Sequence, residues 1–132
     1  MTVRFFDRQN PTNPLHGTIV EDRKGIREIV RSSSGREPFL AELVSEPERR
    51  LMIGLGAKGG CAQYSANDDP PYLMAVGNPE ALEEEEYVEF LMADTPTPIS
   101  TRYLLSLPVV EEVATHFLET GKPSPARSWE EI

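Results

Sequence analysis

Cysteine and long apolar runs are both scarce in this sequence of 132 residues. The single cysteine, Cys61, cannot form an internal disulfide or a CxxC motif, so we interpret it as a small buried side chain. No window approaches eighteen consecutive apolar residues, so no transmembrane helix is predicted. The first residues, MTVRFFDRQNPTNP, lack the apolar segment and cleavage site of a secretory signal. We therefore expect a cytoplasmic chain that forms one domain around one core.

Positive charge is missing from the middle of the chain, because the segment from Gly59 to Thr101 contains no lysine or arginine. The two flanking segments nearly balance their charges, so this segment supplies an excess as large as the net charge of -9. Such a negative field repels nucleic acid and anionic membranes and speeds encounter with a positively charged partner. We expect no nucleic-acid partner and no membrane partner. The acidic residues of the segment are Asp68, Asp69, Glu80, Glu83, Glu84, Glu85, Glu86, Glu89 and Asp94.

Motifs that carry catalysis or bind metal are also missing. There is no G-x-S-x-G sequence, and no motif links Cys61 to His16 or His116. The acidic residues do not form a D-x-D-x-D-G calcium loop, and no His/Cys cluster has zinc spacing. Adjacent exposed glutamates share one environment, whereas acid-base catalysis needs two groups with different pKa values. We therefore predict no catalytic residue, no metal ligand and no cofactor.

Two segments have the apolar spacing of amphipathic helices. In residues 21–35 apolar side chains recur three and four positions apart from Ile26 onward, before a serine-rich stop. Residues 107–121 carry a wider apolar stripe that needs a sheet to lie on. Pro108 suits the first helical position, and Gly121 suits a left-handed C-cap. The sequence therefore predicts one helix near each end of the chain.

Alternation with a period of two predicts strands between these helices. The predicted strands are PFLAELVSE, RRLMIGLGAKGG, CAQYSAND, PPYLMAVGN, EEYVEFLMAD and, over residues 100–107, STRYLLSL. The stretch TVRFFDR is interpreted as an edge strand or an extended arm. The predicted fold class is α+β: a single antiparallel β-sheet of about five or six strands packed against an N-terminal and a C-terminal helix.

The order of the last elements resembles a known protein family. The strands EEYVEFLMAD and RYLLSLP are followed by the helix VVEEVATHFLETG, a Gly-Lys-Pro turn and a terminal SWEEI. This order is similar to the C-terminal half of the first immunity-protein family of bacterial polymorphic toxin systems. The similarity covers residues 72–132, and Trp129, Glu130 and Glu131 match the Trp-acidic close of the family.

The resemblance implies a single immunity-protein-like domain over residues 1–132 that is not an enzyme. Such a protein binds and neutralises one cognate toxin, often a deaminase- or nuclease-type enzyme that acts on nucleic acid. An enzyme that binds a polyanion has a basic substrate-binding face. An inhibitor rich in carboxylates can bind to this face and block it. We expect a monomer that forms a one-to-one complex with a basic enzymatic domain.

The acidic segment and its nearest aromatic residue are the predicted contact with this partner. Two alternatives stay open: the glutamates can be a merely solvated turn, and the chain can be a small metabolite-binding or accessory α+β module of a larger enzyme complex. Trp129 is expected to fold back onto the core. The predicted partner-binding residues are Asp68, Asp69, Glu83, Glu84, Glu85, Glu86, Tyr87 and Glu89.

Overall fold

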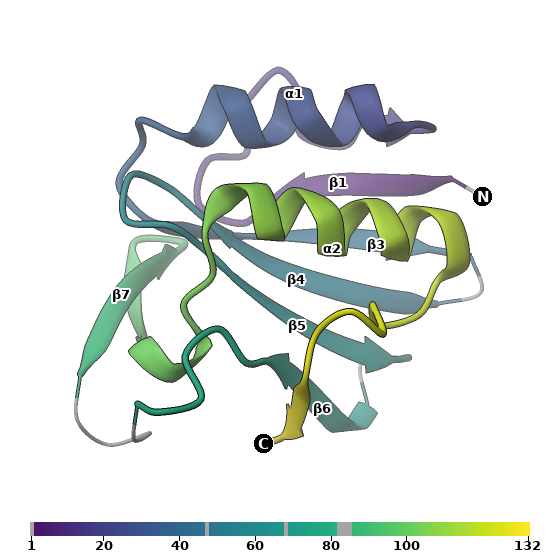
Figure 1. Cartoon of the computed structure of the whole chain (residues 1–132). Helices are drawn as coiled ribbons and strands as arrows, with labels where there is room; N and C mark the ends of the chain where they lie inside the picture. Colours follow the sequence, from purple (N-terminus) through teal and green to yellow (C-terminus); the bar gives the residue numbers. More distant parts are fainter. Residues whose placement is uncertain (1, 47, 68, 82–85) are drawn as a thin grey trace.

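Two helices cover one face of a β-sheet in the computed structural model (Figure 1). The structure describes residues 2–46, 48–67, 69–81 and 86–132. The fold is α+β, as the alternation and the helical spacing predicted. The elements, in chain order, are β1 (Val3–Asp7), β2 (Ile19–Val20), α1 (Arg23–Ser33), β3 (Phe39–Ser45), β4 (Arg49–Leu55), β5 (Cys61–Ala66), β6 (Asp69–Ala75), β7 (Tyr87–Met92), β8 (Thr95–Ser100), a 3-10 helix (Thr101–Tyr103), α2 (Leu107–Thr120) and β9 (Trp129–Glu131).

The sheet contains nine strands in the part of the chain that the structure describes, so the predicted five or six are too few. Its main path runs β2-β1-β3-β4-β5-β6-β9, and neighbours along this path are antiparallel. The β7–β8 hairpin stands beside the path, because β7 meets β3 through one parallel pair, Phe39 with Leu91. Strands β2 and β9 were missed because two and three residues are too short to show alternation.

The predicted strand over residues 100–107 is wrong. The second strand of the hairpin lies earlier in the chain, at β8, and a 3-10 helix follows it directly. Strand β8 was overlooked because it contains Pro96 and Pro98, and proline cannot donate a hydrogen bond to a ladder. Proline is tolerated there because, among the described strands, β8 pairs only with β7 and has a free edge.

Strand β1 is an interior strand, so its interpretation as an edge strand or arm is also wrong. It pairs with β3 on one side and with β2 on the other. The loop that leads from β1 back to β2 is held by the buried carboxylate of Asp7. This carboxylate accepts hydrogen bonds from the backbone N–H groups of Gln9 (2.9 Å) and Asn10 (2.7 Å). It also accepts from the side chains of Asn13 (3.0 Å) and Arg36 (2.7 Å).

Both predicted helices are confirmed, and each has a defined end. Asp22 caps the N-terminus of α1, where its side chain accepts a hydrogen bond of 3.1 Å from the N–H of Gly25. Helix α2 ends at Gly121, whose φ of 71° is the left-handed conformation that glycine adopts without strain. The N–H of Gly121 donates to the carbonyl oxygen of Phe117 at 2.7 Å. The cap of α1 therefore satisfies a backbone donor at its start, and the cap of α2 satisfies a backbone acceptor at its end.

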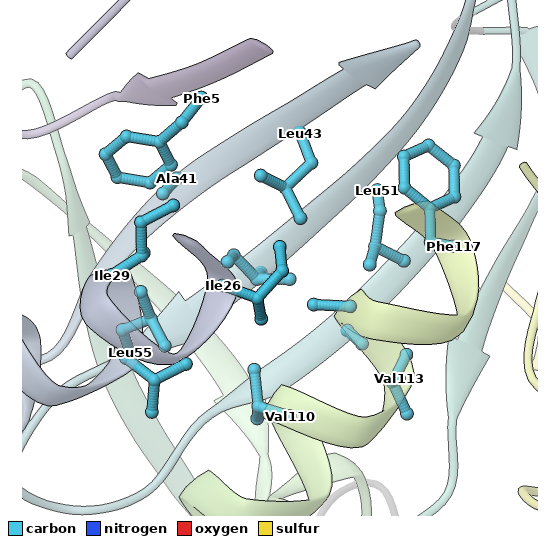
Figure 2. Packing of buried hydrophobic residues seen from close by; sticks show 14 of the residues in the cluster. Phe5, Ile26, Ile29, Ala41, Leu43, Leu51, Leu55, Val110, Val113 and Phe117 are labelled. Atoms are coloured by element: carbon cyan, nitrogen blue, oxygen red, sulfur yellow. The ribbon is translucent and has the colours of Figure 1, made fainter. Parts of the chain in front are cut away.

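The main hydrophobic core lies between the two helices and the sheet (Figure 2). Figure 2 shows Ile26 of α1 and Val110 and Phe117 of α2 among the side chains of Leu43 and Leu51 from β3 and β4. All five are buried. Because side chains alternate along a strand, the residues between these core positions face the other side of the sheet. A second cluster of buried residues, described below, lies on that side.

Candidate partner-binding site

The β7–β8 hairpin covers part of the sheet face that lies opposite the helices. Its Phe90 ring is fully buried in the second hydrophobic cluster, together with Leu40, Cys61 and Met74. Gly54 of β4 leaves room for this ring. A Cβ at Gly54 would lie 2.6 Å from the Phe90 ring and 2.6 Å from the sulfur of Cys61, so no larger side chain is accommodated without movement. The hairpin is thus packed on the sheet through its middle.

The turn end of the hairpin is tied to the body of the protein. Ala93 and Asp94 form the two-residue turn, with φ values of 48° and 65° that suit the right-handed twist of the strands. Asp94 and Gln9 exchange two hydrogen bonds, of 2.7 Å and 2.6 Å. The N–H of Leu91 donates to the carbonyl oxygen of Pro38 at 2.8 Å. These contacts fix the hairpin, and its other end carries Glu86, Tyr87 and Glu89, three of the predicted partner-binding residues.

A groove of about 390 Å³ lies between the other end of the hairpin and the strands β5 and β6. Met74, Ile99, Tyr87 and Ile132 are among the residues that line it. The side chain of Tyr87 is 51% exposed and that of Ile132 is 57% exposed. Ile19 on β2, at the far edge of the sheet, is the other large apolar residue among the described ones with comparable exposure. Exposed apolar side chains that gather at one groove mark a surface that a partner can cover.

Three of the predicted partner-binding residues lie together beside this groove. Glu86, Tyr87 and Glu89 are exposed where β7 begins. Asp69 is also exposed, but it begins β6 five residues before Met74, which is about 16 Å at about 3.3 Å per residue. The structure therefore separates Asp69 from the groove. Asp68, Glu83, Glu84 and Glu85 lie outside the described residues.

Negative charge lies beside the groove. Glu86 and Glu89 flank Tyr87 on one side, and Glu130 precedes Ile132 on the other side, whereas Glu131 lies on the opposite face of β9, with Trp129. Arg102, next to the lining residue Tyr103, is ion-paired: its Nε lies 2.5 Å from an oxygen of Glu130. Among the described residues, the strands that line the groove carry no lysine or arginine. A positively charged partner therefore meets the carboxylates of Glu86 and Glu89 on the β7 side of the groove.

Trp129 lies away from the groove and packs against the main core, as predicted. It begins β9 and pairs with Ala75 of β6. Its indole N–H donates to the carbonyl oxygen of Ser124 at 2.8 Å, so its polar atom is satisfied inside the protein. Residues 129–131 therefore contribute a partly buried side chain that packs against the core, and an edge strand.

Nucleophilic chemistry at Cys61 is unfavourable in this structure. Burial raises the pKa of its thiol from the ordinary value of 9.0 to about 12, so the thiol is protonated at neutral pH. His16 accepts a hydrogen bond at Nδ1 from the backbone N–H of Asp7, at 2.9 Å, which is a structural role. Across the described residues, no group of three His, Cys, Asp or Glu side chains is arranged to hold a metal ion. The described helices are all too short or too polar to cross a membrane.

The sequence analysis singled out Tyr87, which lines the groove, but it did not predict the groove or the residues on its opposite side. Met74 and Gln63 line the groove together because the register of β5 and β6 pairs them, which cannot be read from either segment alone. One feature of the sequence indicated that Ile132 could lie on this surface. Alternation after Trp129 places Glu130 and Ile132 on the same side of the chain, an acidic and an apolar residue together.

The chain was compared with known proteins. The family model described as Immunity protein Imm1 matches residues 16–131, which is most of the chain. A search of curated proteins gives no match.

Proposed function

The chain belongs to the Imm1 family of immunity proteins, and from this membership we propose that it is a non-catalytic inhibitor that binds and neutralises one cognate bacterial toxin. Binding alone is sufficient for this role, because an inhibitor that covers the active site of an enzyme needs shape, charge and a few buried contacts. The buried thiol of Cys61 is protonated at neutral pH, so the proposed function assigns it no nucleophilic role.

The proposed toxin is an enzyme that acts on nucleic acid, of the deaminase or nuclease type. Such an enzyme must attract phosphate groups, so its substrate-binding face is basic. The inhibitor would present carboxylates to this face and compete with the nucleic acid for it. The observation that carries this proposal is the exposed Tyr87 between Glu86 and Glu89, an aromatic contact residue inside a negative surface.

The proposed inhibitor acts in the cytoplasm as a monomer that forms a one-to-one complex. A toxin that attacks nucleic acid acts where nucleic acid lies, so its inhibitor must be in the same compartment. We also propose that residues 1–132 act as a single domain. Both hydrophobic clusters pack against the same sheet, which supports one cooperative unit.

Co-expression with the cognate toxin domain, to be sought in the product of the adjacent gene, tests this function. Cells that express the toxin domain alone should stop growing, and cells that also express this protein should grow. A matched control expresses the same toxin domain with an unrelated protein of similar size and charge. Purified components should form a one-to-one complex by light scattering, and the complex should lack the activity of the toxin on nucleic acid. Growth arrest that persists with this protein present would overturn the proposal.

A further inference from the structure

We infer that the groove between the β7–β8 hairpin and strands β5, β6 and β9 receives an apolar side chain from an extended, basic segment of the partner protein. The inference rests on the proposed function and deepens it, because it assigns the contact surface and the chemistry of the segment that binds there. Tyr87 and Ile132 stand on opposite sides of the groove as its two contact residues.

The distribution of exposed apolar side chains supports this site. Tyr87 and Ile132 lie far apart in the sequence, yet both are more than half exposed and both line the same groove. Between them lie Met74 and Ile99, which belong to the second hydrophobic cluster or pack against it. A side chain that enters the groove would therefore contact the hydrophobic interior of the protein. Contacts of this kind, buried and central, contribute most of the binding energy of protein interfaces.

The size of the groove limits what can enter it. The groove measures about 390 Å³, which one or two side chains can occupy. An extended segment can insert one side chain while its neighbours, which point in the opposite direction or along the rim, stay outside.

The charge around the groove defines those neighbours. Glu86 and Glu89 lie beside Tyr87 on the β7 side of the groove. On the β9 side, Glu130 is paired with Arg102, and Glu131 lies on the opposite face of the strand, with Trp129. Lysine or arginine beside the inserted side chain would complement Glu86 and Glu89, and carboxylates there would be repelled. The expected segment therefore contains an apolar residue flanked by basic residues.

Substitutions at the groove test this assignment, with the toxin domain encoded by the adjacent gene as the probe. Tyr87→Ala and Ile132→Ala should each raise the Kd at least about tenfold, as expected for central contact residues. Gln63→Trp should have a similar effect, because an indole from β5 would fill the groove without removing an exposed contact. Ile19→Ala is the matched control, since Ile19 is 55% exposed but lies on the other edge of the sheet, and its Kd should change less than about twofold. Urea unfolding of each variant shows whether it is still folded.

The outcomes separate this inference from the proposed function. If the wild-type protein binds the toxin domain and all three groove variants bind equally well, the groove inference is wrong and the proposed function stands. If the wild-type protein does not bind or inhibit the toxin domain, both are wrong. A dimer that Ile132→Ala dissociates in sedimentation experiments would assign the groove to a second copy of the chain. A small molecule that native mass spectrometry finds in the wild-type protein but not in Gln63→Trp would assign the groove to a metabolite.

The segment of the partner can be identified from the other side of the complex. Alanine substitutions across the toxin domain should include one apolar residue, adjacent to lysine or arginine, whose effect on the Kd is not additive with that of Tyr87→Ala. Coupling to an apolar residue flanked by carboxylates would contradict the expected segment.

Discussion

Gly54 of β4 and Phe90 of β7 are in such close contact that a Cβ on the glycine would lie 2.6 Å from the aromatic ring. These two residues belong to strands that do not pair with each other. Their contact is one of the points where the hairpin rests on the sheet. The position of the candidate binding surface, which includes the start of the same hairpin, therefore depends on the absence of a side chain at position 54.

Gly54→Ala should lower the free energy of unfolding by about 1–3 kcal/mol, because the added methyl group has to displace the Phe90 ring and the sulfur of Cys61. Urea unfolding measures the change. Gly35→Ala is the matched control, since a Cβ there meets no atom within 4 Å, and it should change stability by less than about 0.5 kcal/mol. Equal changes in the free energy of unfolding for the two substitutions would show that the close contact between Gly54 and Phe90 does not limit the side chain at position 54.

The reactivity of Cys61 reports whether the hairpin stays on the sheet. The thiol is buried beside Gly54 and in the same cluster as Phe90, so a thiol reagent should modify the native protein far more slowly than the urea-unfolded chain. Phe90→Ala, which removes the ring that covers this region, should speed the reaction at a urea concentration where the variant is still folded. A native protein that reacts as fast as the unfolded chain would contradict the packing.

The raised pKa of Cys61 also predicts a loss of stability at alkaline pH. The pKa is 9.0 for the ordinary thiol and about 12 in the folded protein. Between these values the unfolded chain releases the thiol proton and the folded protein retains it, so rising pH favours unfolding by up to about 1.4 kcal/mol per pH unit. Cys61→Ala should remove this component. Urea unfolding of both proteins at pH 8 to 10.5 measures it, and parallel pH profiles would contradict it.

Asp7 should stabilise the protein at neutral pH and lose that effect in acid. Burial alone would raise the pKa of Asp7, but hydrogen bonds from Arg36, Asn13, Asn10 and Gln9 outweigh burial and hold the pKa below its ordinary value of 3.8. A lowered pKa stabilises the folded state above the unfolded pKa, and the stabilisation disappears as the pH falls through the folded pKa.

Asp7→Asn should therefore cost about 1–3 kcal/mol at pH 7, because it removes the charged acceptor from Arg36. The difference in the free energy of unfolding between wild type and variant should shrink below about pH 4, because Asp7 of the wild-type unfolded chain then becomes protonated. Thermal or urea unfolding from pH 7 to pH 3 measures this difference. A difference that does not depend on pH would show that the ion pair contributes little.

Charge reversal at the start of β7 should slow association with the toxin domain. Replacing Glu86 and Glu89 by Lys changes the local charge by four units, and we expect the association rate to fall about tenfold at low salt. The effect should decrease at higher ionic strength because salt screens exposed charges. Glu119→Lys, on the exposed side of α2, is the control and should leave the rate nearly unchanged. Stopped-flow or surface-based kinetics at two salt concentrations measures both rates.

Periodicity predicted the elements whose faces differ in polarity. The helices over residues 21–35 and 107–121 and five of the six predicted strands are present, because each buries one face against the core. Short or proline-containing elements could not be predicted in this way. Strands β2 and β9 are strands only because β1 and β6 provide partners for them. Their formation depends on tertiary structure, which a single segment does not encode.

The candidate site was predictable in its charge and in one residue, Tyr87. The absence of lysine and arginine from the middle of the chain is enough to indicate a negative surface, because charge does not depend on how the strands pair. The groove was not predictable, because its walls come from β5, β6, β7, β8 and the residue after β9. Pairing of distant strands creates such a surface, and the same pairing carries Asp69 away from it.

The prolines of β8 affect how the protein behaves at high concentration. Met92 and Thr95 close a two-residue turn as a hydrogen-bonded pair, so residues 95, 97 and 99 direct their N–H groups toward β7. Pro96 and Pro98 then occupy the outward positions, where an ordinary residue would offer a donor to any passing strand. An exposed strand edge with free donors promotes edge-to-edge pairing at high concentration. With these two prolines, the hairpin can remain exposed while its free edge is protected from such aggregation.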